Sequence, residues 1–423
     1  MDGRSLPRLL TPIPGPRSRA TVDVLARHEC PAVTARRARR AATLGAADDD
    51  PVVWDEAVGA NVRDVDGNVF VDLTSGFGVA LVGHRHPAVV AAAAEQADRL
   101  VHAMGDAWPD RTRVALLERL AALAPGDLEV SLLGLSGSDA VDAAVKTAVM
   151  ATGRPGVVAF DRAYHGLALG VLGLQAYKPS FSEPFRALTH PAVRHLPWGC
   201  PVERLDEALD DTVGLVLLEP IQGRGGVHEA PEGWLRAVAE QTRANGSLLA
   251  FDEVQTGLGR TGDWFAGPAA GVVPDLLCVG KALGGGYPLS ACIGSRAVMD
   301  AWGASTGEAL HTQTFLGHPV GCAAALAVLD LLEGGVLDQV RACGDRLRGG
   351  LEARGLGVRG RGLLLAVETG RPSLAVARAL LRRGYLVLPA DERSLTLSPP
   401  ACLTADQAAA FTTALCDVLE EGA

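Results

Sequence analysis

Lysine is scarce in this chain of 423 residues: only three of its 39 basic residues are lysines, Lys146, Lys178 and Lys281. A mechanism that depends on a lysine therefore has three candidates. Aromatic residues make up 4% of the chain, and 49 acids against 39 bases give a net charge of −10. This acidic balance argues against a nucleic acid or an anionic membrane as a partner.

The eight cysteines form no Cys-x-x-Cys pair and no other spacing that is typical of a metal site. Most of them lie in apolar surroundings, which favours buried thiols in a reducing cytoplasm. The N-terminus has no long apolar stretch of the signal-peptide kind, and charges or glycines interrupt the apolar stretches before 18 residues. We therefore expect a cytoplasmic protein without a membrane span.

The pattern along the chain predicts an α/β fold. Residues 1–20 are expected to form an extended arm, and residues 21–45 a helix whose basic run ARRARRAA faces solvent. Asp66-Gly67 lies between alternating apolar residues, which predicts a β-hairpin. From about residue 85 to 300, helical stretches alternate with apolar strands expected at 130–135, 156–160, 213–218, 247–251, 275–279 and 290–294. This alternation predicts a mostly parallel sheet covered by helices.

We predict three segments. Residues 1–60 form an N-terminal arm and segment, residues 61–318 a large α/β domain, and residues 319–423 a small C-terminal α+β domain. A chain of this length is expected to bury more than one core, because single cores stop growing at roughly 250–300 residues.

The stretch LLAFDEVQTGLGRTG, residues 248–262, ends a predicted strand in Asp252, Glu253 and Gln255. Ligands of open α/β sheets bind beyond the carboxyl ends of the strands, so an acid there is placed for a cofactor. The same stretch contains a Gly-x-Gly-x-x-Gly pattern, on which alone a dehydrogenase would rest. No helix opens after it, so the phosphate-binding geometry of a dinucleotide site is missing.

Lys281 directly follows an apolar strand and precedes three glycines, in DLLCVGKALGGGYPLSA, residues 275–291. A lysine in that position is partly desolvated, which lowers its pKa and favours Schiff-base chemistry. The alternative is a surface lysine at the end of a strand.

Gly137-Ser138-Asp139 opens an amphipathic helix after a strand, in GLSGSDAVDAAVKTA, residues 134–148. The free N–H groups of a helix start favour an anion, most commonly phosphate. Helix capping would explain Ser138 and Asp139 without any ligand. The near match to the Gly-x-Ser-x-Gly motif of hydrolases ends in Ser, and no histidine follows in a triad position. A phosphate site, an acid at a strand end and a lysine are the three features that pyridoxal phosphate needs.

The sequence also resembles the class III (ω-amino) aminotransferases of fold type I, relatives of the ornithine, acetylornithine and 4-aminobutyrate aminotransferases. The resemblance runs from about Ile13 to the C-terminus. It rests on the motifs DVDGNVFVDLTSGFGVALVGHRHP, SGSDAVDAAVK, AFDRAYHG, LEPIQG, FDEVQTGLGRTG, GKALGGGYPLSA, HTQTFLGHPVGCAAALAVL and VRGRGLLLAVE. It implies a large domain with a mostly parallel sheet, a smaller C-terminal domain and the cofactor pyridoxal 5′-phosphate.

The resemblance implies a role for each matching residue. Lys281 would form the Schiff base and move the proton between the substrate Cα and the cofactor C4′. Asp252 would keep the ring nitrogen protonated, and Gln255 would bond the ring hydroxyl. The other cofactor contacts would come from Gly137 and Ser138 at the phosphate, Tyr164 on the ring face, His165, Glu219, and Thr314 of the neighbouring subunit in a homodimer. The pair His84 and His86 would belong to a loop, and no metal site is expected.

The substrate-binding positions depart from the family pattern. Leu167 stands where enzymes acting on ω-amino acids often have an arginine, directly after Tyr-His-Gly. Thr396 replaces the usual arginine of the LRLSPPL-like strand, and Arg224 replaces that arginine's usual acidic partner. Phe77 is a further predicted substrate-binding residue. Two carboxylate anchors are therefore missing, and one acid has become a base.

We predict an aminotransferase that takes an amino group from L-glutamate and delivers it to an aldehyde or ketone lacking the usual carboxylate. An amino-sugar or aminoglycoside-type intermediate of secondary metabolism would fit. The alternatives are a 4-aminobutyrate or other ω-amino-acid aminotransferase with a relocated anchor, and a racemase or aminomutase using the same lysine. Arg224 would bind the donor carboxylate, or else point to solvent or pair with Glu229.

Overall fold

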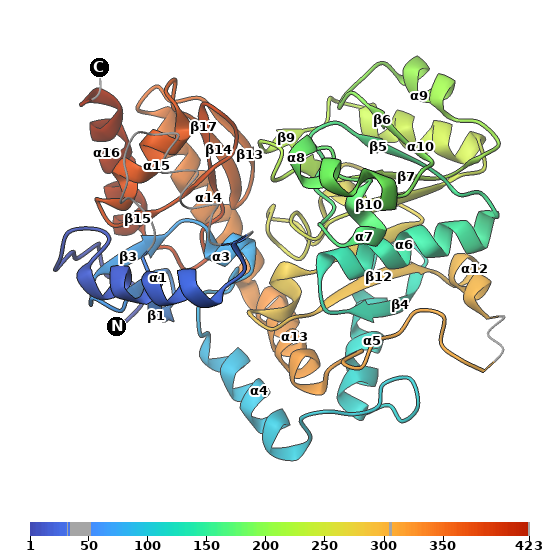
Figure 1. Cartoon of the computed structure of the whole chain (residues 1–423), viewed down its shortest axis with the longest axis horizontal. Coiled ribbons are helices and arrows are strands. Elements are labelled where there is room, and N and C mark those ends of the chain that lie inside the picture. Colours follow the sequence, from blue (N-terminus) through green and yellow to red (C-terminus); the bar gives the residue numbers. More distant parts are fainter. Residues whose placement is uncertain (32, 34–51, 304–306, 422–423) are drawn as a thin grey trace. The chain divides into compact units, whose positions relative to one another are not determined.

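The computed structural model describes residues 1–31, 33, 52–303 and 307–421 of the chain. The chain divides into two compact units (Figure 1). We call Pro87–Val340 the large unit, and Met1–His86 together with Arg341–Ala423 the split unit. The three-segment division at residues 60 and 318 stays a prediction.

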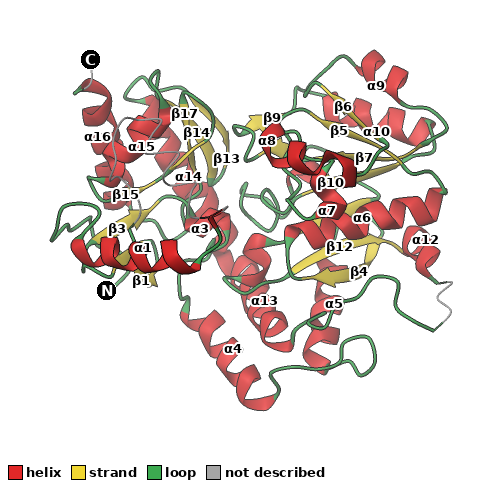
Figure 2. Cartoon of the chain, viewed as in Figure 1, coloured by secondary structure: helices red, strands yellow, loops and turns green. Residues whose placement is uncertain are grey.

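A seven-stranded sheet lies at the centre of the large unit (Figure 2). Its strands are β4 Leu128–Gly134, β5 Gly156–Phe160, β6 Val193–Leu196, β7 Val213–Leu218, β10 Leu248–Asp252, β11 Leu276–Val279 and β12 Ser290–Ser295. Their order is β4-β12-β11-β10-β7-β5-β6. β10 runs parallel to β7 and β11, and β5 runs parallel to β6 and β7, whereas β12 is antiparallel to both of its neighbours. The predicted mostly parallel α/β sheet is confirmed.

The inner strands of this sheet are apolar on both faces because helices cover the sheet. All six residues of β7, VGLVLL, are buried, as is typical of the inner strands of a parallel sheet. Helix α6, Gly137–Thr152, packs across β4, β12, β11, β10 and β7. Its sheet-facing side is rich in small residues, including Ala140, Ala144 and Ala148, and their burial forms much of the core of this unit.

The remaining elements of the large unit surround this sheet. They are α4 Pro87–Arg99, α5 Arg111–Leu123, α7 Leu169–Leu172, α8 Pro179–Ser182, η1 Glu183–Leu188, α9 Val202–Ala208, β8 Ile221–Gln222, β9 His228–Glu229, α10 Trp234–Ala244, α11 Ala266–Ala269, η2 Lys281–Gly284, α12 Arg296–Met299, η3 Asp300–Trp302, α13 Pro319–Leu331 and η4 Leu332–Val336.

The helical run Pro319–Glu352 is the one run within the described residues that is long and apolar enough to cross a membrane. Half of its most apolar window is buried, and α13 packs against α4 and α5. A helix in the core of a soluble protein can be as long and as apolar as a membrane-spanning helix, so this run is weak evidence for a membrane span. Asp330 and Glu333 lie inside it, and such interruptions were the basis for expecting no membrane span.

The split unit contains two four-stranded sheets, ordered β1-β2-β3-β15 and β13-β14-β17-β16. Its elements are α1 Pro16–His28, β1 Trp54–Val58, β2 Asn61–Asp64, β3 Val69–Asp72, α3 Ser75–Gly78, most of α14 Leu337–Glu352, β13 Val358–Arg361, β14 Leu364–Glu368, α15 Ser373–Leu381, β15 Tyr385–Leu386, β16 Leu388–Pro389, β17 Ser394–Leu397 and α16 Ala405–Glu420. The predicted hairpin is confirmed, since β2 and β3 pair antiparallel and Gly67 adopts φ +88° between them.

The start of α1 corrects the sequence prediction, because the helix begins at Pro16 and the extended arm does not reach residue 20. The Asp66 carboxylate accepts hydrogen bonds from the backbone N–H groups of Arg17 (2.7 Å) and Ser18 (2.8 Å). These are donors that a helix start leaves without an intrahelical partner. The basic run ARRARRAA lies outside the described residues.

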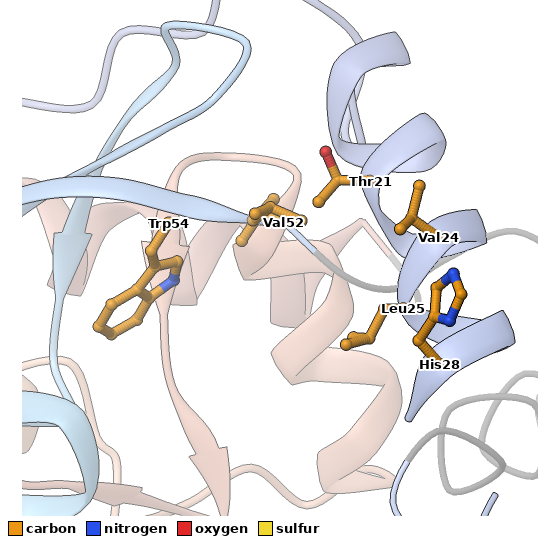
Figure 3. A pocket seen from close by; sticks show the side chains of 7 residues that line it. Thr21, Val24, Leu25, His28, Val52 and Trp54 are labelled. Atoms are coloured by element: carbon orange, nitrogen blue, oxygen red, sulfur yellow. The ribbon is translucent and has the colours of Figure 1, made fainter. Parts of the chain in front are cut away.

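An open apolar groove of about 470 Å³ lies between α1 and β1 in the split unit (Figure 3). Its lining residues are Thr21, Val24, Leu25, His28, Val52, Val53 and Trp54. None of the residues that the sequence singled out for chemistry lines this groove.

Candidate active site

Asp252 ends strand β10, next to β11, and its side chain is buried. Its Oδ2 atom lies 2.8 Å from Nδ1 of His165, whose ring donates to the carboxylate, and its Oδ1 accepts from the Val254 backbone N–H at 3.1 Å. His165 is also buried, and its Nε2 has no hydrogen-bond partner among the described residues. Asp252 is therefore held in one orientation by two donors.

Lys281 follows β11 after a single glycine and opens η2 with φ +41°, a backbone conformation that is uncommon for a residue with a long side chain. Its Nζ donates to Oε1 of Gln255 at 3.3 Å. The pKa of Lys281 is lowered to about 8, mainly by burial and to a smaller extent by the charges of Arg224 and Arg260, whereas Asp252 and Glu219 oppose the shift. A lysine with such a pKa loses its proton readily near neutral pH, as a nucleophilic amine must.

Glu219 follows β7 and is almost fully buried. Its Oε1 accepts from the Tyr164 backbone N–H at 2.9 Å, and its Oε2 accepts from the Gly223 backbone N–H at 3.0 Å. Burial raises the pKa of Glu219 to about 7, with His165 acting in the opposite direction. The carboxylate thus joins two loops, one carrying Tyr164 and His165 and the other leading to Arg224.

The N-terminus of α6 is capped by Ser136, not by Ser138. The Ser136 hydroxyl accepts from the Asp139 backbone N–H, and the Asp139 carboxylate accepts from the Ser136 N–H in return. Capping therefore explains Asp139. The hydroxyl of Ser138 takes no part in the cap, so it is available to a ligand. A Cβ at Gly166, which adopts φ +105°, would collide with that hydroxyl, so glycine allows the two segments to approach closely.

These groups fit pyridoxal phosphate. The first amides of α6, at Gly137 and Ser138, have no partner within the helix and can donate to a phosphate. The Asp252 carboxylate can hold a proton on a pyridine nitrogen, and Lys281 offers an amine for an aldehyde. The buried Nε2 atom of His165 is a further polar group left for a ligand or a water molecule.

The family model for class III aminotransferases matches residues 44–419 of the chain. The chain belongs to this family. Its relatives include the acetylornithine aminotransferase of Mycobacterium tuberculosis, which is 39% identical over 379 residues, covering 88% of this chain and 92% of the relative. The acetylornithine aminotransferase of Streptomyces coelicolor is 40% identical over 372 residues, covering 86% of this chain and 90% of that relative.

Solved structures of transaminases are also similar to this chain. An amine transaminase from an uncultivated Pseudomonas species, solved with pyridoxal phosphate bound, has a TM-score of 0.82 at 28% identity, covering 88% of this chain and 95% of that one. An (S)-enantioselective omega-transaminase from Thermomicrobium roseum has a TM-score of 0.84 at 26% identity, covering 95% and 98%. The predicted fold type I architecture, the cofactor pyridoxal phosphate and the aminotransferase activity of this class III enzyme are confirmed.

The structure brings together most of the predicted cofactor-binding residues within the large unit. Thr314, predicted to serve a neighbouring subunit, is exposed on that unit. Phe77 and Thr396 belong to the split unit, where Phe77 is 58% exposed and Thr396 lies half-buried on β17. The roles of all of these residues in binding stay predictions.

Arg224 contacts the ring of Tyr164, and Leu167 lies in the same loop as Tyr164, three residues further along the chain. The guanidinium carbon of Arg224 lies 4.3 Å from the centre of the Tyr164 ring and 5.3 Å from that of Tyr177. Among the described residues, Arg224 contacts these two rings and forms no ion pair. Leu167 is 44% exposed, directly after Gly166.

Sequence reasoning gave no role to Glu253 and did not notice Tyr177. The buried Glu253 accepts hydrogen bonds from the backbone N–H groups of Ala266 (2.7 Å) and Gly267 (2.9 Å), and burial raises its pKa to about 7. It supports the loop after the glycine-rich stretch. The only local signal for Tyr177 was its rarity, since the chain has four tyrosines.

Proposed function

We propose that this class III aminotransferase takes its amino group from L-glutamate and passes it to an aldehyde or ketone without the usual carboxylate. The observation that carries the proposal is the position of Arg224, whose guanidinium lies over Tyr164, the residue expected on the cofactor ring. An arginine without an acidic partner is suited to a substrate carboxylate. Leu167, exposed and apolar, supports an acceptor that is uncharged at that position.

Pyridoxal phosphate, when bound, supplies an electron sink for the electrons left at the substrate Cα after its proton is removed. The residues of the chain would hold the cofactor and move the protons. Asp252, oriented by His165, would hold the proton on the pyridine nitrogen. Lys281, with its pKa near 8, would take the proton from Cα and return it at C4′. The α6 amides and Ser138 would hold the phosphate.

A second candidate substrate is N-acetylornithine, which the names of the relatives at 39–40% identity favour. The departures at Leu167 and Thr396 speak against it, because enzymes of ω-amino acids often carry an arginine after Tyr-His-Gly. A 4-aminobutyrate or other ω-amino-acid aminotransferase would need a relocated anchor. A racemase or aminomutase would use the same lysine but return the amino group to the same molecule.

We also infer that the active unit is a cytoplasmic homodimer, in which Thr314 reaches the phosphate bound by the neighbouring subunit. Leu310 and Phe315, close to Thr314 in sequence, are both at least half exposed, as side chains at an interface between subunits would be in one isolated chain. All eight cysteines are free thiols, which supports a reducing compartment. Size-exclusion chromatography with light scattering tests the dimer.

The decisive experiment is a single-turnover screen, in which the absorbance of the bound cofactor reports transfer of the amino group from each donor. L-glutamate should react faster than N-acetylornithine, 4-aminobutyrate and simple monoamines. The aminated enzyme is then mixed with carboxylate-free aldehydes and ketones, amino-sugar precursors among them. Faster reaction with N-acetylornithine than with L-glutamate would refute the proposed donor.

A further inference from the structure

Two tyrosines form a corner around Arg224. The ring of Tyr164 and the ring of Tyr177 have centres 6.1 Å apart and meet at 88°. The guanidinium of Arg224 lies against both rings, at 4.3 Å and 5.3 Å from their centres. The ring of Phe181 lies near that of Tyr177, with centres 6.3 Å apart and an angle of 23° between the planes. We call Tyr164 and Tyr177 the tyrosine corner.

Backbone hydrogen bonds position each member of this arrangement. The Ala176 N–H donates to the Ala163 carbonyl at 3.0 Å, which ties the residue before Tyr177 to the residue before Tyr164. Glu219 binds the backbone N–H groups of Tyr164 and Gly223, and Gly223 directly precedes Arg224. The corner is therefore built by the fold and does not depend on the arginine alone.

The two rings cover only part of the guanidinium. Because they meet at 88°, the planar guanidinium can lie flat against at most one of them. An arginine has five N–H donors in that plane, so donors that the rings do not cover stay available to a ligand. Arg224 is half-buried and forms no ion pair within the described chain, so its donors lack an anionic partner. The charge of Arg224 also contributes to the lowered pKa of Lys281.

We propose that the tyrosine corner holds the guanidinium of Arg224 in one orientation, with its N–H edge toward a donor carboxylate, and that Tyr177 is a specificity-determining residue. The ligand class is an amino donor with a second carboxylate. This inference rests on the proposed function in one respect, the glutamate donor. Tyr177 acts through Arg224 and is a positioning residue.

The test is binding of glutarate, a dicarboxylate that has no amino group and cannot react, to the holoenzyme by isothermal titration calorimetry. Tyr177→Ala should weaken glutarate binding about 10-fold, because the arginine loses one of its two walls. Tyr177→Phe keeps the ring and should bind within about 3-fold of wild type. Lys178→Ala is the control for charge, since Lys178 also lies near the Tyr177 ring, at 5.2 Å, but is exposed.

The double variant Tyr177→Ala/Arg224→Ala separates positioning from general damage. If Tyr177 acts through Arg224, the double variant should bind glutarate no more weakly than Arg224→Ala alone. Equal weakening by Tyr177→Ala in both backgrounds would overturn the proposal. So would wild-type glutarate affinity in Tyr177→Ala combined with a lower kcat for every donor, the pattern of a merely structural role.

The kinetics with L-glutamate distinguish this inference from the proposed function. Tyr177→Ala should raise KM for L-glutamate more than it lowers kcat, and should change KM for a monoamine little. If glutarate binding depends on Arg224 and Tyr177 but L-glutamate gives no turnover, the proposed donor is wrong, whereas the proposed role of the tyrosine corner in positioning Arg224 is supported. If L-glutamate turns over but glutarate binding is unchanged in the Arg224→Ala and Tyr177→Ala variants, the corner is wrong and the donor stands.

Discussion

The two sides of the candidate site are held in different ways. On the cofactor side, Asp252, His165 and Glu219 are buried and fixed by hydrogen bonds between 2.8 and 3.1 Å. On the substrate side, Arg224 is held by aromatic rings and Leu167 is largely exposed. A buried carboxylate must be hydrogen-bonded, so a change on the cofactor side endangers the fold as well as the chemistry. The substrate side is free of that constraint, and it is there that this chain departs from the family.

Removing the amine of the cofactor side should have the largest effect. Lys281→Ala should bind pyridoxal phosphate without a covalent bond and lose transaminase turnover by several orders of magnitude, as expected for a lost nucleophile. Borohydride reduction of the wild-type holoenzyme followed by peptide mapping should place the cofactor on Lys281. Lys146→Ala is the matched control, since Lys146 pairs with Asp142 at 2.7 Å on the surface of α6. Cofactor trapped on Lys146 or Lys178 would refute the assignment.

The next effect tests the carboxylate that His165 orients. Asp252→Asn keeps an oxygen for the Val254 N–H but removes the charge that holds a proton on the ring nitrogen. Proton abstraction should slow by about 10³-fold, the upper range for losing one preorganised electrostatic contact, and cofactor binding should weaken. Stopped-flow single-turnover experiments measure the rate of proton abstraction, and fluorescence titration of the apoenzyme measures cofactor binding. Rates near those of wild type would mean that the cofactor side is fixed for the fold and not for its electronics.

On the substrate side, Arg224→Lys and Arg224→Ala should both raise the apparent KM for L-glutamate. Loss of a bidentate contact between charged groups should cost about 2–4 kcal/mol, or a factor of roughly 30 to 1000. Lysine should not rescue, because its single ammonium group cannot form the two parallel bonds of a guanidinium. A monoamine donor is the internal control and should be affected less. Equal use of L-glutamate by both variants and wild type would show that Arg224 is no anchor.

The sequence predicted features of the cofactor side better than those of the substrate side. Strands β5, β7 and β11 are continuous apolar runs, so they were predictable. Strand β6, whose residues are VRHL, was not predicted, because it carries charge. The start of α1 depends on Asp66, 48 to 49 residues away along the chain, and Ser136 in place of Ser138 as the cap is a matter of local geometry. Asp252 and Lys281 were found because Asp252 ends a strand and Lys281 follows the next strand after a single glycine. Tyr177 was not, because a tertiary hydrogen bond between Ala163 and Ala176 places it beside Tyr164.

The smallest expected effect is a change in the pKa of Lys281 when Arg224 is replaced. It tests whether the substrate side influences the cofactor side. Burial and, to a smaller extent, the charge of Arg224 lower the pKa of Lys281 to about 8, so Arg224→Ala should raise that pKa, by less than about one unit for one partly buried charge. Asp252 acts in the opposite direction, so Asp252→Asn should lower it. With only three lysines in the chain, reductive ¹³C-methylation of the apoenzyme should give few NMR signals, and each can be titrated and assigned by substitution. An Arg224→Ala variant whose Lys281 pKa is unchanged would mean that the substrate side can vary without altering the reacting amine.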